Sequence, residues 1–153
     1  MANYAVAVGF DKNSAGHPAK GNNQITSFAT TLDFAKIVAA RAAAGATALA
    51  AADTLEVIPL PAGSVILSAG LQVVKAETTN TTATFSLGHT GGSPAAANAY
   101  AALTPSNALG YAAANLANPT LIGAADTVDL LLNTAVPTDA VIRVFVVVAN
   151  VAG

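Results

Sequence analysis

Hydrophobic and polar residues alternate in several segments of the chain, which is the pattern of half-buried β-strands. In ITSFATTLDF (25–34), Phe28, Thr30, Leu32 and Phe34 fall on one side of an extended backbone. Three more strands are predicted in DTLEVIPL (53–60), SVILSAGLQVVKAE (64–77) and TTATFSLG (81–88). The links between these three are short and rich in turn residues, so parallel crossovers are excluded and an antiparallel meander is expected.

Two further strands are predicted near the end of the sequence. In TVDLLLN (127–133), Val128, Leu130 and Leu132 share one face. In AVIRVFVVVAN (140–150), both faces are largely apolar. A strand that is apolar on both faces lies in the middle of a sheet or against a partner subunit.

The remaining segments have weaker patterns. The alanine-rich stretch 35–52 favours a short helix near 35–44 on propensity. Residues 89–126 are low in charge, and short strands are expected around 99–103 and 120–122, because a structureless loop of this length is improbable. The pattern as a whole predicts an all-β protein, an antiparallel β-sandwich or jelly roll with at most one short helix.

Residues 1–24 differ from the rest and are predicted to form an extended N-terminal arm before a β-sandwich domain at 25–153. Tyr4, Val6, Val8 and Phe10 lie on one side of an extended segment and could dock on a neighbouring protein. The alternative is that these residues form a poorly ordered chain terminus.

Charge is scarce, because only 9% of residues are charged and the formal net charge is −2. The six Lys and Arg residues are scattered singly, so nucleic acid is not an expected partner. No apolar run is long enough for a spanning helix and no secretory signal is recognised, so neither a membrane nor a targeting segment is expected. Isolated soluble domains carry about a quarter charged residues, so this chain is expected to hide surface against copies of itself or a scaffold.

Few residues of the chain are suited to catalysis or metal binding. The sequence has no cysteine, and its histidines are His17, in the predicted arm, and His89, interpreted as a loop residue at the sandwich rim. Asp126 and Asp129 are interpreted as solvated turn and strand positions. No dense acidic loop for calcium is present. We therefore expect no enzymatic activity, metal or cofactor.

The residues Asp53, Leu55, Val57, Pro61-Ala62-Gly63-Ser64-Val65 and Leu87-Gly88 form a strand pair followed by a Thr-rich strand. This arrangement, over residues 32–150, resembles small head structural proteins of tailed phages, especially marine and cyanobacterial podoviruses. The resemblance implies a capsid decoration (cement) protein, a homotrimer assembled in the host cytoplasm that binds the major capsid protein on the capsid exterior. It implies no catalytic residues.

The expected mechanism is mechanical, since a multivalent clamp that bridges neighbouring capsomers gains avidity beyond each weak site. Residues 1–24 are the predicted capsid anchor, with a reach of about 70 to 80 Å when extended. The alternative is a head fibre, a knob or a tail-associated module that binds a host receptor or glycan. Aromatic residues are only 5%, and Tyr100 and Tyr111 are the only ones in 89–126, which weakens a glycan-binding role. A major capsid protein would need more residues and a helical spine.

Overall fold

The computed structural model describes residues 3–5, 25–89 and 96–150. Its elements, in chain order, are β1 (Asn3–Ala5), β2 (Ile25–Asp33), α1 (Phe34–Ala43), β3 (Thr54–Leu60), β4 (Ser64–Lys75), β5 (Thr84–His89), β6 (Ala96–Pro105), β7 (Gly110–Ile122), β8 (Asp126–Leu132) and β9 (Val141–Asn150).

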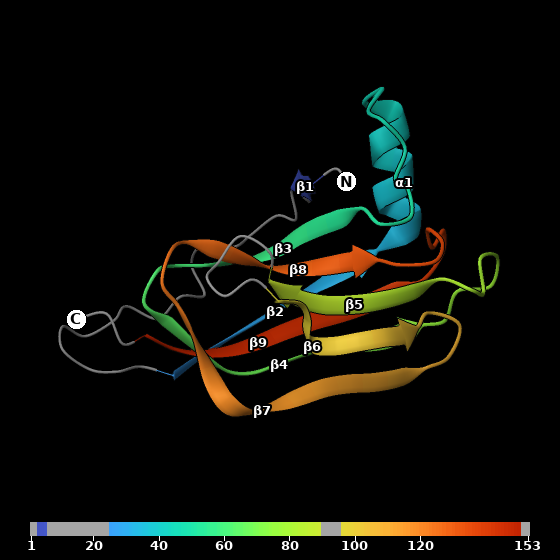
Figure 1. Cartoon of the computed structure of the whole chain (residues 1–153). Helices are drawn as coiled ribbons and strands as arrows, with labels where there is room; N and C mark the ends of the chain where they lie inside the picture. The colour runs from blue at the N-terminus through green and yellow to red at the C-terminus, as the bar shows by residue number, and fades with distance from the viewer. Residues whose placement is uncertain (1–2, 6–24, 90–95, 151–153) are drawn as a thin grey trace.

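The strands form two sheets that face each other, with α1 projecting from one end (Figure 1). Sheet A has the order β1-β3-β8-β5-β6, and sheet B has the order β2-β9-β4-β7. Among the strands of the described residues, every pair is antiparallel apart from the parallel pair β1–β3. Strands β2 to β9 follow the strand order of a jelly roll, so the predicted fold class is confirmed.

The predicted meander of three consecutive strands is wrong. β3 and β5 belong to sheet A, whereas β4 lies in sheet B between β9 and β7. The turn at Pro61 and Gly63 therefore carries the chain from one sheet to the other, and Gly63 supplies the positive φ of 80° that this turn requires. Turn chemistry gives the position of a chain reversal, but it does not determine which sheet the next strand joins.

The helix occurs one residue earlier than predicted. Asp33 caps its N-terminus, because the carboxylate accepts a hydrogen bond from the Lys36 amide at 3.3 Å. Gly45, with a φ of 63°, follows the last turn. Among the described helical residues, none belongs to a helix long and apolar enough to cross a membrane.

The core lies between the sheets and consists of the inward-facing residues that alternate along each strand. Phe34 at the start of α1 stacks on Phe85 of β5, with ring centroids 5.6 Å apart. Each large aliphatic or aromatic side chain buried here contributes about 1.5 to 3 kcal/mol. The largest fully buried residues include Leu32, Leu55, Ile58, Leu60, Ile66, Leu71, Leu87, Ile122 and Leu130.

Two of the weakly predicted segments form longer strands than expected. The strand expected at 99–103 is β6, of ten residues, and the one expected at 120–122 is the end of β7, of thirteen. Both are rich in Ala, and β7 also contains two Asn residues, and these residue types have low β propensity. They are strands because β6 pairs with β5 and β7 pairs with β4, so their hydrogen bonds are supplied by tertiary structure.

Candidate interaction surfaces

The predicted capsid-contact residues fall mostly outside the described residues. Tyr4 lies in β1, where its backbone is in parallel register with Leu55 of β3. Val6, Val8 and Phe10 lie outside the described ranges. Their capsid contact, and the division into arm and sandwich at residue 24, therefore stay predictions.

The outward side of sheet B is an open, weakly polar surface. Because the inward positions of β9, such as Val144 and Val146, are buried, the intervening positions point outward. The strand registers place these outward residues in cross-strand rows. We call this surface the open face of sheet B, and its rows are Ile25-Ala149-Val65-Leu121, Ser27-Val147-Ser68, Ala29-Phe145-Gly70-Ala113 and Thr31-Arg143-Gln72-Tyr111. The row Asp33-Val141-Lys75, which contains two charged residues, borders this face at the α1 end.

Large apolar side chains on the open face are exposed to solvent. Ile25 is 68% exposed, Leu121 53% and Tyr111 65%, all on the edge strands β2 and β7. The Tyr111 ring stacks on Phe145, with centroids 5.5 Å apart and an interplanar angle of 6°. Among the positions in the four rows of this face, Arg143 is the only charged residue. A face of this composition is suited to contact with another protein.

One feature of the sequence indicates this surface, namely the apolar residues on both faces of β9. β9 lies between β2 and β4, so it has the first of the two placements predicted for it, in the middle of a sheet or against a partner subunit. The contributions of Ile25, Tyr111 and Leu121 were not foreseen. They become neighbours only through strand pairings between segments far apart in the chain.

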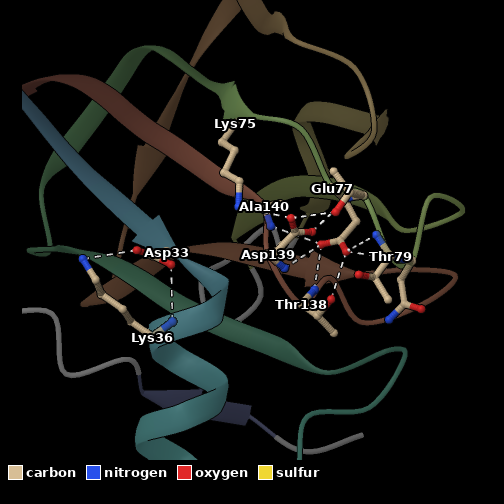
Figure 2. A network of polar contacts seen from close by, with 10 residues as sticks. Asp33, Lys36, Lys75, Glu77, Thr79, Thr138, Asp139 and Ala140 are labelled. Atoms are coloured by element: carbon tan, nitrogen blue, oxygen red, sulfur yellow. Dashed lines mark hydrogen bonds and ion pairs between the residues drawn. The ribbon is translucent and has the colours of Figure 1, made fainter.

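A buried carboxylate organises the links at the α1 end of the sandwich (Figure 2). Glu77, 2% exposed, follows β4, and its two oxygens accept hydrogen bonds from amides on both sides. On its own link the donors are the amides of Thr79 and Asn80, at 3.1 and 3.0 Å. On the β8–β9 link, Glu77 accepts from the amides of Thr138, Asp139 and Ala140 at 2.7 to 3.1 Å, and from the Thr138 hydroxyl at 3.0 Å.

Asp139 adds a second set of contacts between the same two links. It accepts hydrogen bonds from the amide and hydroxyl of Thr78, both at 2.9 Å, and forms an ion pair with Lys75 at 3.1 Å. These Thr78 donors, foremost among the causes, hold the pKa of Asp139 below its ordinary value. Burial alone would raise the pKa of Glu77, but the amides of Asp139, Asn80 and Thr138 together outweigh it and lower that pKa. Both carboxylates thus act as structural anions that fix the links.

A groove of about 350 Å³ lies between α1, the segment after it and these links. Its lining is mostly apolar, with Val38 and Leu49 among the larger side chains. Arg41, at its rim, donates hydrogen bonds to the Thr47 carbonyl, which ties the helix to the returning chain. The groove therefore offers an apolar hollow and few polar groups for fixing a small ligand.

The interpretation of His89 as a loop residue at the sandwich rim is wrong. His89 is the last residue of β5, is 1% exposed, and stacks on Tyr100. The Tyr100 hydroxyl lies 2.7 Å from His89 Nδ1. Burial, aided by the charges of Asp126 and Asp129, raises the pKa of Tyr100 well above its ordinary value. A buried histidine is tolerated here because a buried hydroxyl hydrogen-bonds to it.

The interpretation of Asp129 as a solvated position is also wrong. Asp129 is 2% exposed, and Asp126 is half-buried. Asp129 lies on the central strand β8, between Glu56 of β3 and Gly88 of β5, and it accepts a hydrogen bond from the Thr127 hydroxyl. Neighbouring strands on both sides shield a side chain on a central strand from solvent, even when that side chain points away from the core. In the part of the chain that the structure describes, no three His, Cys, Asp or Glu side chains are grouped to hold a metal.

Comparison with known proteins gives matches to solved structures. No protein-family model matches the sequence, and no curated protein matches it. The fold is similar to chains in three phage capsid structures, at TM-scores of 0.55 to 0.58. In the capsid of Ralstonia phage GP4 the match has 15% identity and covers 99% of this chain and 100% of that chain.

The other two matches cover nearly as much. In the cyanophage Pam1 capsid, identity is 19%, with 92% of this chain and 97% of that chain covered. In the acid-stable capsid of Helicobacter pylori bacteriophage KHP30, identity is 12%, with 84% of this chain and 90% of that chain covered. The chain therefore shares its fold, almost from end to end, with chains found in phage capsids.

Proposed function

We propose that this chain is a structural protein of a phage virion that binds the outer surface of the capsid as an oligomer and stabilises the shell. The observation that carries the proposal is the end-to-end similarity of fold to chains in three phage capsids. A jelly roll alone hosts many functions, so the fold by itself would be weak support. Because all three matched chains come from phage capsid structures, the capsid role is the best supported one.

The size of the matched chains favours a decoration protein over a shell-forming one. The match in phage GP4 covers 99% of this 153-residue chain and 100% of the other chain, so the two are of similar length. A jelly roll of this size is suited to sit on a shell that other proteins build. The low charge of the chain agrees with this role, because its surface would be covered in the virion.

The proposed mechanism is a clamp across neighbouring capsomers. A rigid sandwich joined to its copies presents several capsid contacts at once, and their avidity exceeds the affinity of each contact. Residues 1–24 would supply the reach to the capsid surface when β1 leaves the edge of sheet A, where it pairs with β3 in the isolated chain. Tyr4, Val6, Val8 and Phe10 would form the apolar side of this anchor.

Binding to capsids that lack the protein tests the proposal. Purified protein is mixed with bare capsids, and its position is located by cryo-electron microscopy. We expect ordered density on the outer shell surface and capsids that withstand higher temperature. Density on the tail, or no binding to the shell, would contradict the capsid role.

The anchor is tested separately by two matched arm variants. Replacing Tyr4, Val6, Val8 and Phe10 with serine removes the apolar side, while replacing Ala5 and Ala7 with serine alters the opposite side. We expect the first variant to lose at least tenfold in capsid affinity, which corresponds to about 1.4 kcal/mol, and the second to bind normally. Equal binding by both variants would rule out the arm as anchor.

A tail-associated module that binds a host receptor or glycan is the second candidate. The exposed Tyr111 ring, backed by Phe145, is an aromatic surface of the kind on which sugars stack. The other tyrosine of this region, Tyr100, is buried and unavailable. Glycan binding that is lost in Tyr111→Ala, together with labelling at the tail, would favour this candidate.

A further inference from the structure

The open face of sheet B is large enough for a stable protein contact. Its four strands, spaced about 4.8 Å apart, span about 19 Å, and the ten residues of β9 extend about 33 Å. The face therefore measures on the order of 600 Å², and two such surfaces in contact bury on the order of 1,200 Å². Stable interfaces bury about 1,000 Å² or more in total.

The chemistry of the face fits a permanent contact. Its rows consist mostly of Ala, Ser, Val and larger apolar residues, with Arg143 near the α1 end. Interfaces between permanently associated copies are more apolar than transient ones. A second copy also brings no concentrated like charge against the first, because the four rows contain a single arginine and the bordering Asp33 and Lys75 have opposite charges.

The protein that covers this face must be present before any capsid is available. This step rests on the proposed function, because a decoration protein exists free before it binds the shell. An apolar sheet face of this size, left open with Ile25, Tyr111 and Leu121 exposed, would promote aggregation of the free chain. Another copy of the same chain is available from synthesis onward, whereas the capsid surface is not.

We propose that the open face of sheet B is the surface through which copies of this chain associate. Val147 and Phe145 on the central strand β9 form the middle of the contact, and Ile25 and Leu121 on the edge strands complete it. The capsid-binding groups then lie elsewhere on the molecule.

The test places charge on the face without disturbing the core. The double variant Ile25→Asp with Leu121→Asp changes two strongly exposed side chains, so the fold is expected to be retained by circular dichroism. Ala29→Arg, at an exposed position of β2 opposite Phe145, is the second variant. Leu103→Asp is the matched control, because Leu103 is 65% exposed in sheet A, outside the open face, and its φ of 48° suits aspartate.

Light scattering measures the mass of each protein in solution. We expect the parent chain and Leu103→Asp to be oligomers, and the two open-face variants to fall to the mass of a single chain. A monomeric parent chain, or open-face variants that keep the parent mass, would overturn the inference. Variants that keep the mass but lose capsid binding would assign the face to the capsid, which overturns this inference and leaves the proposed function standing.

Discussion

Gly70 lies in the central strand β4 at a position where no side chain fits. A Cβ placed there would come within 2.6 Å of the Ala112 carbonyl oxygen and of Phe145 Cζ, and within 2.8 Å of Ala113 Cβ. The carbonyl belongs to the neighbouring strand and cannot move without breaking the sheet register. The absence of a side chain at Gly70 therefore lets the Phe145 ring lie flat across the sheet.

Substitution of Gly70 is expected to destabilise the fold. We predict that Gly70→Ala lowers the free energy of unfolding by about 1 to 3 kcal/mol, because the added methyl group overpacks the site. Gly123→Ala is the control, since a Cβ at Gly123 meets nothing within 4 Å. Denaturant unfolding measures both, and equal stabilities of the two variants would contradict this account of Gly70.

At the scale of elements, the two links at the α1 end are held by one buried side chain. Glu77 uses both of its oxygens to join the link after β4 to the link before β9. We predict that Glu77→Gln costs about 2 to 4 kcal/mol, because the amide nitrogen of glutamine would face backbone N–H donors. Glu56→Gln, at a half-buried position of β3, is the control and is expected to change stability by about 0.5 kcal/mol or less.

The same carboxylates determine how the stability of the links depends on pH. The pKa values of Glu77 and Asp139 are lowered from ordinary values of 4.5 and 3.8 in the folded protein. As pH falls, the unfolded chain takes up protons first, so the stability that these groups contribute is complete above about pH 5 and is lost as pH falls through their folded-state pKa values.

We therefore expect the Tm to be constant from neutral pH to about pH 5 and to fall below it. In Glu77→Gln the decrease should be shallower, because one of the two groups no longer titrates. Thermal unfolding followed by circular dichroism across this range is the measurement. Parallel Tm curves for the parent and the variant would show that Glu77 is not a source of the acid sensitivity.

At the scale of the whole molecule, contacts are expected to depend little on salt. Only 9% of residues are charged, and the open face of sheet B carries Arg143 as its charged residue. Association driven by apolar surface is not screened by ions. We predict that the oligomer mass and the capsid affinity change less than about threefold between 0.1 M and 1 M salt, measured by light scattering and by capsid sedimentation. A steep loss with added salt would indicate an electrostatic contact instead.

The sequence determined the elements of this protein better than their arrangement. Short-range signals predicted real features, because they act over a few neighbouring residues. Alternation predicted the strands at 25–34 and 127–133, turn residues predicted the reversal at Pro61 and Gly63, and alanine propensity predicted the helix near 35–44. The all-β class followed from their sum. The central place of β9 was also predictable, since both of its faces are apolar.

Only the tertiary structure decided which strands are neighbours and which polar side chains are buried. Except for the pair β5 and β6, consecutive strands from β2 to β9 lie in opposite sheets, so β4 pairs with β9 and β7 rather than with β3 or β5. The burial of His89 and Asp129 and the convergence of two links on Glu77 follow from these long-range pairings. The open face of sheet B has the same origin, because its rows join residues such as Ile25 and Leu121 that are adjacent only when the sheet is assembled.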